Sequence, residues 1–525
     1  MPASRSLAVA AAINWAAFAC AMAVSFFMAP YLIHGLGKER YGVWCVVDGI
    51  LAYFTLLDMG VAACLVRFVA RHHAAGERDE LNRLVSACLA VFLAAAVVVV
   101  VVGSALVPFV GPALERQLGE PGDVSAFMLL MLLNVAATLP LSVFPTILDG
   151  MQRFGTKSAL RLAFLAVRVG GVVVVLETQP GLLALGIVYT ATNLVEHAAA
   201  AWLAYRAVPG LRISRRLIDC ETLHRVKGYS LDSFLAMLAG RVTVQTGAIV
   251  IGGFAGVVAA AHYSVAARLI ETAKGLLRAV TSTLTPTVSE REATGDLAGV
   301  RAVFLGGTRW VLYLVLPVHL GILAYGRPFL ARWVGTEYAD VCFPAAAILS
   351  ATLTIGVAQS AASRVLYGMG KLRLFARLAL LEAVVNLVLS LALVGPYGVE
   401  GVAVAVAGPN LLFCAATIGY AAWVLDVGAV AYLRSAWARP LLAAAVPAVV
   451  WVLMPPAEAA WGAIAFAIAC GLGPYALGVF VLEALPFKWQ KRQSPGTAVP
   501  GLSEVRGNRA APPGAPPLPR LTVRG

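Results

Sequence analysis

The chain has 525 residues, of which 60% are hydrophobic and only 13% are charged, and its mean hydropathy is +0.83. These values exclude a water-soluble globular protein, which would carry about twice that fraction of charge. The formal net charge of +13 does not require a nucleic-acid partner, because the basic residues lie between apolar stretches about 20 residues long. Composition and charge together indicate a membrane protein.

The apolar stretches predict fourteen membrane-spanning helices and an all-α, polytopic membrane protein. Backbone groups in lipid need hydrogen bonds within their own segment, and these runs lack the alternation typical of barrel strands. The first run is predicted to be a retained helix, because it is longer than the apolar core of a signal peptide. The predicted spans are 8–31, 42–65, 84–108, 125–148, 162–177, 182–204, 231–253, 257–283, 302–325, 342–363, 378–394, 401–424, 440–455 and 460–484.

Lysine and arginine are distributed unevenly between the predicted loops. With the N-terminus placed inside, the inner segments hold 28 of the 40 Lys and Arg residues and the outer segments hold five. The positive-inside rule therefore predicts that both termini are cytoplasmic. Residues 486–525 are rich in Pro, Gly and charge, which predicts a disordered cytoplasmic tail.

Similar residues recur along the chain at an interval of 216 to 219 positions. ILDGMQRFGTKSALR (147–161) is similar to VLYGMGKLRLFAR (365–377), and Gly76 and Asn193 match Gly295 and Asn410. The interval covers six predicted helices, so the two copies have the same orientation in the membrane, with a site expected between them. The predicted domains are an N-terminal lobe with its linker (1–230), a C-terminal lobe (231–430), two added helices (431–485) and the tail (486–525).

Four charged residues lie inside the predicted span 257–283: Arg268, Glu271, Lys274 and Arg278. At about 100° per residue they fall within an arc of about 120° on one helix face. An arginine near the bilayer centre costs about 2.5–3.5 kcal/mol to insert, so this face is predicted to point toward protein or water. Because cations outnumber carboxylates, we predict that Arg268, Lys274 and Arg278, with Arg241 on the preceding span, bind an anionic substrate.

A purely structural role explains the same charges without a ligand. Glu271 would neutralise Arg268 or Lys274 three residues away and join its helix to a neighbour. Glu271 is also a candidate for coupling or gating, together with Asp58 at the end of the second span and Glu196 in the sixth. Asp58 is alternatively a polar contact that fixes its helix, and Asp48 is predicted to share its helix face.

Other polar residues in the spans have open interpretations. Glu196 and His197 form either a proton relay or a packing pair, and asparagines such as Asn193 and Asn410 form either interhelical hydrogen bonds or sugar contacts. The eight cysteines are scattered singly. Since no nucleophile and base arrangement, metal-ligand spacing or phosphate loop occurs, we predict no catalytic residue, no metal and no cofactor.

The segment NWAAFACAMAVSFFMAPYLIHGLGKERYGVWCVVDGILAYFTLLDMG resembles the opening of the polysaccharide flippases of the multidrug/oligosaccharidyl-lipid/polysaccharide (MOP) exporter superfamily. The shared features are an early Asn, a Pro before the exit of the first helix, the pattern G-x-x-x-Y-G-x-W and a closing L-D-x-G. PFLARWVGTEYADV (328–341) is similar to the external loop before the tenth helix of that family. The matching residues of the opening are Asn14, Pro30, Gly37, Tyr41, Gly42, Trp44, Leu57, Asp58 and Gly60.

The resemblance covers about residues 8 to 485 and implies a Wzx-like flippase with two six-helix bundles around a central cavity. Such a protein moves undecaprenyl-diphosphate-linked oligosaccharide to the outer leaflet of the bacterial inner membrane, for O-antigen or exopolysaccharide synthesis. The implied partners are the lipid-linked substrate, membrane lipids, and the polysaccharide polymerase and export machinery, with no nucleic acid.

Three alternatives remain open. A lipid II flippase and a drug or cation exporter belong to the same superfamily, and a cation exporter is expected to use acidic cavity residues. A membrane-bound polymerase or ligase is an alternative of another class, but it would need a substantial external loop, and the longest predicted outer segment has about 17 residues.

Overall fold

The computed structural model describes residues 2–58, 61–119, 123–218, 231–281, 284–454 and 461–484, and for 2–15, 18, 58, 63, 231–236 and 279 only the backbone. The described residues are helical almost throughout and contain no strand, which confirms the all-α prediction. The elements are α1 (Pro2–Leu36), α2 (Lys38–Phe54), η1 (Thr55–Asp58), α3 (Val61–Ala75), α4 (Arg78–Leu118), α5 (Asp123–Leu141), α6 (Val143–Gly150), α7 (Phe154–Thr178), α8 (Leu182–Ala207), η2 (Arg215–Leu217), α10 (Leu231–Phe254), α11 (Val257–Thr281), α12 (Leu284–Ala293), α13 (Leu297–Trp333), α14 (Thr336–Gly368), α15 (Arg373–Val424), α16 (Ala429–Tyr432), η3 (Leu433–Trp437), α17 (Ala438–Leu453) and α18 (Trp461–Ala484).

Twelve helical segments of the described chain are long and apolar enough to cross a membrane. The charges of α11 keep it out of this set, and α15 contains two spans, because Gly398 adopts φ 52° and ψ −130° and breaks the helix. Each of the fourteen predicted spans therefore corresponds to a helix. The ends were predicted less well: α4 and α13 extend beyond 84–108 and 302–325, because helices continue past the apolar run into charged residues.

The valine run of α4 shows how lipid decides secondary structure here. β-Branched residues lose side-chain freedom in a helix and favour strands in water. Yet residues 97–102 are all valine and all helical, and Val97 and Val101 are 62% and 63% exposed. In a hydrocarbon environment each backbone N–H needs a partner within its own segment, and only a helix provides one for a single span.

The structure reproduces the internal repeat in detail. In the turn after α3, His72 contacts Glu77 at 2.7 Å, and in the turn after α12, Arg291 contacts Asp296 at 3.1 Å. These pairs lie 219 residues apart, and the glycine inside each turn has φ of 72° or 73°. Such a left-handed conformation suits glycine because it has no Cβ. These turns agree with the predicted repeat, in which α1 to α8 form the first repeat and α10 to α15 form the second.

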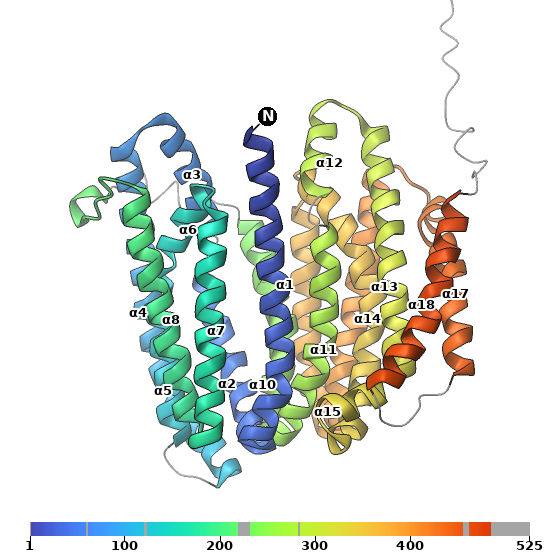
Figure 1. The fold of residues 1–525 in the computed structure, drawn as a ribbon, viewed down its shortest axis with the longest axis horizontal. Helices are drawn as coiled ribbons and strands as arrows, with labels where there is room; N and C mark the ends of the chain where they lie inside the picture. The colour runs from blue at the N-terminus through green and yellow to red at the C-terminus, as the bar shows by residue number, and fades with distance from the viewer. Residues whose placement is uncertain are drawn as a thin grey trace, which may run out of the picture. The chain divides into compact units, whose positions relative to one another are not determined.

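Figure 1 shows α4, α5, α7 and α8 on one side of α1, and α11, α13 and α14 on the other. Helices α17 and α18 follow the second repeat and pack against α13. The Tyr475 hydroxyl donates to the Tyr313 carbonyl at 2.5 Å, and the Trp451 indole donates to the Ala467 carbonyl at 2.9 Å. Residues Met1–Val479 form one compact unit, and the division into lobes at residue 230 stays a prediction. The predicted tail, 486–525, lies outside the described residues.

The two repeats meet where α2 packs against α10 and α11. A Cβ atom on Gly42 would lie only 1.9 Å from the carbonyl oxygen of Val257, and one on Gly252 would lie 2.3 Å from a methyl carbon of Val46. Only glycine permits backbones to approach so closely. These contacts lie near the α1–α2 and α10–α11 turns, at the end of the bundle that we call the Gly37 end.

Polar contacts also join the two repeats at the Gly37 end. The Gln117 side chain accepts a hydrogen bond from the Val257 N–H at 2.9 Å and donates one to the Gly252 carbonyl at 3.3 Å. Lys38 at the start of α2 forms an ion pair with Glu337 at the start of α14, at 2.8 Å. Each contact joins the first repeat to the second, so the repeats are closed against each other at this end.

Replacement of Gly42 by Ala should destabilise the protein by about 1–3 kcal/mol, because the new methyl group overlaps a backbone carbonyl that cannot rotate away. Thermal unfolding in detergent measures the effect as a lowered midpoint. Gly253→Ala on α10 is the matched control, since a Cβ there meets no atom within 4 Å. Equal midpoints for the two variants would contradict the proposed close packing.

Candidate functional site

A cavity of about 480 Å³ lies between the repeats. Helices α1, α2 and α7 of the first repeat and α10 and α11 of the second contribute to its wall. The charged residues that line it are Asp48, Arg161, Arg268 and Glu271, and among its polar residues are Ser25, Gln245, Ser264 and Thr272. The contacts at the Gly37 end close this cavity on that side, so its position matches the site predicted between two lobes.

Arg268 faces the cavity between the repeats, as the sequence predicted. Its guanidinium donates to the Ser25 hydroxyl of α1 at 3.1 Å, a neutral partner. Asp48 on α2, across the joint between the repeats, acts on it electrostatically. Asp48 is also within electrostatic range of Arg241, whose own side chain is exposed and outside the set of residues lining either cavity described here.

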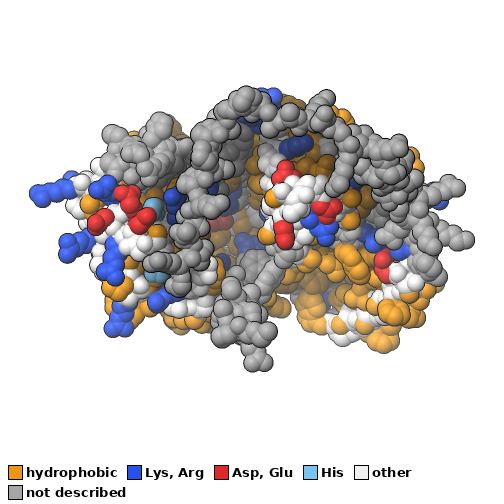
Figure 2. Space-filling view, turned by 90° about the horizontal axis from the view of Figure 1, so that it is seen from above, with side chains coloured by type: hydrophobic (Ala, Val, Ile, Leu, Met, Phe, Trp, Pro, Cys, Tyr) orange, Lys and Arg blue, Asp and Glu red, His pale blue; other side chains and the backbone are white. Residues whose placement is uncertain are grey.

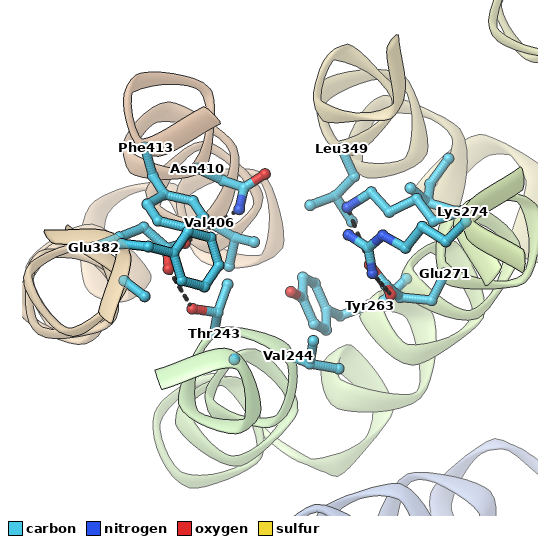
Figure 3. A pocket seen from close by; sticks show the side chains of 16 residues that line it. Thr243, Val244, Tyr263, Glu271, Lys274, Leu349, Glu382, Val406, Asn410 and Phe413 are labelled. Atoms are coloured by element: carbon cyan, nitrogen blue, oxygen red, sulfur yellow. Dashed lines mark hydrogen bonds and ion pairs between the residues drawn. The ribbon is translucent and has the colours of Figure 1, made fainter. Parts of the chain in front are cut away.

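A second cavity, of about 190 Å³, lies inside the second repeat between α10, α11, α14 and α15 (Figure 3). Lys274 is 7% exposed and donates to Glu271 at 3.0 Å, and Arg278 lies 3.9 Å from the other oxygen of that carboxylate. The single charged arc predicted for α11 therefore splits between two spaces. Arg268 faces the cavity between the repeats, and Lys274 and Arg278 face the inner one.

Glu271 lines both cavities and is held by two cations. The structural alternative considered for this residue is present in part: it pairs with Lys274, and within the described residues no ion pair joins it to Arg268. Both partners stand three residues from Glu271, so spacing alone did not distinguish them. The structure distinguishes them, because Arg268 contacts Ser25 of α1 and lines the cavity between the repeats, whereas Lys274 lines the inner cavity.

Glu382 on α15 is a buried carboxylate that the sequence interpretation overlooked. It is 6% exposed, lines the inner cavity, and accepts hydrogen bonds from Thr243 at 2.8 Å and Asn410 at 3.3 Å. Figure 3 shows it on the opposite wall from Lys274 and Glu271. The sequence did contain a signal for this site, because Glu382 is the lone acidic residue in the apolar span 378–394. The sequence interpretation considered buried cations and did not consider this carboxylate.

Arg161 was also overlooked, for a topological reason. The sequence placed it in a loop ahead of the span 162–177, but α7 begins at Phe154 and carries Arg161 two turns along the helix. There it lines the cavity between the repeats. Two arginines therefore face this cavity, one from each repeat.

Glu196 lies away from both cavities. It pairs with Arg168 at 3.2 Å, and the same guanidinium donates to Asn193 at 2.5 Å. His197 contacts the backbone carbonyl of Asn193 at 2.8 Å rather than the Glu196 side chain. These contacts agree with a packing role in the first repeat, and the predicted gating role of Glu196 stays a prediction.

The predicted shared helix face of Asp48 and Asp58 stays a prediction, because the side chain of Asp58 lies outside the described part of the structure. Helix α2 ends at Phe54 and continues as the 3₁₀ turn Thr55–Asp58, so the angle of 100° per residue no longer applies beyond Phe54. Asp58 closes this turn. Asp48, which was not a predicted site residue, lines the cavity instead.

The amino-acid sequence matches one protein family and is similar to two curated proteins. Residues 11–292, more than half of the chain, match the family described as "Polysaccharide biosynthesis protein". The uncharacterised membrane protein EpsK of Bacillus subtilis (strain 168) is 23% identical over 409 residues, which cover 75% of this chain and 78% of EpsK. The probable low-salt glycan biosynthesis flippase Agl15 of Haloferax volcanii is 21% identical over 389 residues, covering 73% and 77% of the two chains.

Solved structures share the fold at low sequence identity. The lipid II flippase MurJ in an inward closed conformation superposes with a TM-score of 0.68 and 11% identity, covering 89% of this chain and 98% of MurJ. An inward-facing multidrug resistance MATE family transporter of the MOP superfamily gives a TM-score of 0.61 at 14% identity, with coverage of 77% and 94%. The fold is thus that of MOP transporters, and the chain belongs to the polysaccharide biosynthesis protein family.

Proposed function

We propose that this transporter is a flippase that carries undecaprenyl-diphosphate-linked oligosaccharide from the cytoplasmic to the outer leaflet of the bacterial inner membrane. The product would feed O-antigen or exopolysaccharide synthesis, with the polymerase and export machinery as partners. The observation that supports this substrate best is Arg268, a cation in the cavity between the repeats whose hydrogen-bond partner is neutral. A guanidinium can hold two oxygens of a diphosphate at once.

The charges of the cavity suit an anion with a long apolar tail. Arg161 from the first repeat and Arg268 from the second face the space, while the Glu271 carboxylate is already held by Lys274 and Arg278. Asp48 is then the carboxylate that opposes the two arginines from within the cavity. In this proposal the diphosphate displaces Asp48 as the counter-charge of Arg268, the sugars occupy the polar space, and the polyprenyl chain remains in lipid.

The distribution of charged side chains supports one orientation of the protein in the membrane. Figure 2 views the end opposite the Gly37 end, where Lys, Arg, Asp and Glu side chains gather around α3 and α12. Together with the loop distribution of Lys and Arg, this supports a cytoplasmic position for that end and for both termini. The Gly37 end is then external, and closure there means that the structure represents the state before release.

A drug or cation exporter is the second candidate, and Asp48 is the observation that favours it. A carboxylate exposed in the cavity would attract a cationic substrate, as the acidic residues of such exporters are expected to do. The two candidates differ in which charge the substrate needs. Because the fold is shared, only the site distinguishes them.

Replacement of Arg268 by Ala should weaken binding of a short-chain diphosphate-linked saccharide by about 10- to 100-fold, the loss of one charge-assisted contact of about 1.5–3 kcal/mol. Arg268→Lys should recover part of the loss, since one ammonium cannot form a bidentate contact. Asp48→Asn should strengthen binding, because it removes the opposing charge. Isothermal calorimetry on purified protein, paired with translocation in proteoliposomes, measures both quantities.

Arg116→Ala is the control for this series, since Arg116 lies at the external end of α4 and donates to the Pro112 carbonyl. It should leave binding unchanged. If Asp48→Asn instead abolishes binding of an organic cation while Arg268→Ala leaves the diphosphate affinity intact, the exporter function is correct and the flippase proposal is wrong.

Closure at the Gly37 end should alternate with opening during transport. Cysteines placed at Lys38 and Glu337, in a protein lacking the eight native cysteines, should stop translocation when a short bis-methanethiosulfonate reagent joins them through disulfide bonds, and reduction should restore it. The control pair, Asp149 and Lys157, lies within the first repeat and already forms an ion pair there. Cross-linking this second pair should leave transport unchanged, and full transport by the cross-linked first pair would refute alternation at this joint.

A further inference from the structure

The inner cavity contains two carboxylates and two cations on opposing walls. Glu271 on α11 is paired with Lys274 and Arg278, whereas Glu382 on α15 accepts hydrogen bonds only from neutral groups among the described residues. Thr243 of α10 and Asn410 of α15 are those donors. An ion pair satisfies the first carboxylate, but the second is buried, and among the described residues no cation contacts it.

The partners of Glu382 favour a proton over a metal ion as its ligand. Both neighbours present hydrogen-bond donors to the carboxylate, and the Asn410 carbonyl oxygen lies 3.8 Å from the Cys414 sulfur. Within the described residues no group of three or more His, Cys, Asp or Glu residues stands together. Protonation gives Glu382 an O–H donor, and the Thr243 hydroxyl can accept from it while donating its own proton to the Ala239 carbonyl, 3.1 Å away.

The corresponding place in the first repeat has the opposite charge. Asn193 and Asn410 are equivalent in the repeat, 217 residues apart. Asn193 accepts from Arg168 at 2.5 Å, while Asn410 donates to Glu382 at 3.3 Å. Arg168 and Glu382 lie on equivalent helices about one turn apart. Arginine does not lose its proton in proteins, and the carboxylate beside Arg168, Glu196, is held in an ion pair with it. At this place in the second repeat the carboxylate of Glu382 has neutral hydrogen-bond donors instead.

Glu382 is linked to the cavity between the repeats through shared residues. Its carboxylate acts electrostatically with Lys274 across the inner cavity, and Lys274 is bonded to Glu271, which also lines the space between the repeats. With Glu382 ionised, two carboxylates balance Lys274 and Arg278. With Glu382 protonated, one positive charge remains in excess.

We propose that Glu382 is a proton-binding residue, and that its protonation strengthens binding of the anionic substrate in the cavity between the repeats. The step is the addition of one proton to the Glu382 carboxylate, which gives a neutral acid and breaks no other bond. By linkage the effect is reciprocal, so a bound anion raises the proton affinity of Glu382 by the same factor. This inference rests on the proposed anionic substrate.

Charged and titratable groups face Glu382 from only some of the helices around it. On α11 they are Lys274, Arg278, Glu271 and Tyr263, and on α15 Cys414 lies near; α10 presents the neutral Thr243 and α14 the apolar Leu349. Glu271 is fixed in its ion pairs, and a thiol and a phenol ordinarily keep their protons at neutral pH. Any proton exchange in this cavity near neutral pH is therefore assigned to Glu382.

The test measures the affinity of a short-chain diphosphate-linked saccharide for the purified protein between pH 5 and pH 8. Its diphosphate is esterified at both ends, so its own charge stays constant over this range. Affinity should be highest at pH 5 and fall as Glu382 ionises, on the order of tenfold for one charge about 10 Å away in a medium of effective dielectric constant about 20. Glu382→Gln should bind tightly at every pH.

A second variant and a control make the test independent of whether Glu382→Gln folds. Thr243→Val removes a donor to the ionised carboxylate, so it should shift the midpoint of the pH curve to higher pH while leaving the carboxyl group in place. Glu400→Gln, an exposed carboxylate on the same helix as Glu382 that lines neither cavity, is the matched control and should leave the curve unchanged.

The possible results separate this inference from the proposed function. No binding of the saccharide at any pH would overturn the proposed function itself. Binding that does not change with pH would overturn only the role of Glu382. A pH dependence that survives in Glu382→Gln but disappears in Asp48→Asn would assign the proton to the cavity between the repeats and would also refute the role of Glu382.

Discussion

The close contact between α2 and α11 is the constraint on which the rest of the structure depends. Gly42 lies against the Val257 carbonyl, and the N–H of Val257 is held by Gln117, so one residue is fixed from both sides by the first repeat. Farther along the same two helices, Asp48 and Arg268 line the same cavity and interact electrostatically. Backbone contact near the turns thereby sets the distance between groups of opposite charge deeper in the protein.

Several charged side chains that line the two cavities have polar or charged neighbours. Arg268 donates to the Ser25 hydroxyl, Glu382 accepts from Thr243 and Asn410, and Glu271 pairs with Lys274 and Arg278, as desolvation requires. Glu271 is the most connected of them, because it lines both cavities and holds Lys274 and Arg278. A change of charge in the inner cavity therefore reaches the space between the repeats through one side chain.

The sequence predicted the fold well, because lipid leaves few alternatives to an apolar helix and because the repeat marks equivalent turns such as those at Gly76 and Gly295. It also placed Arg268 in a cavity between two lobes. It could not choose the partner of Glu271, since the candidates at 268 and 274 have equal spacing. Nor could it pair Asp48 with Arg268, because contacts between residues so far apart in the chain depend on how helices pack. The 3₁₀ turn after Phe54 changed the helical angle that had grouped Asp48 with Asp58.

The two equivalent asparagines have a consequence for how such a protein evolves. An amide carries a donor and an acceptor on one planar group, so turning it about a single bond exchanges one for the other. Asn193 lies beside an arginine and Asn410 beside a glutamate, although the residue type is the same at both positions. A gene duplication can therefore reverse the polarity of one copy by altering a single neighbour, and the conserved letter in an alignment of the two halves conceals that they have diverged.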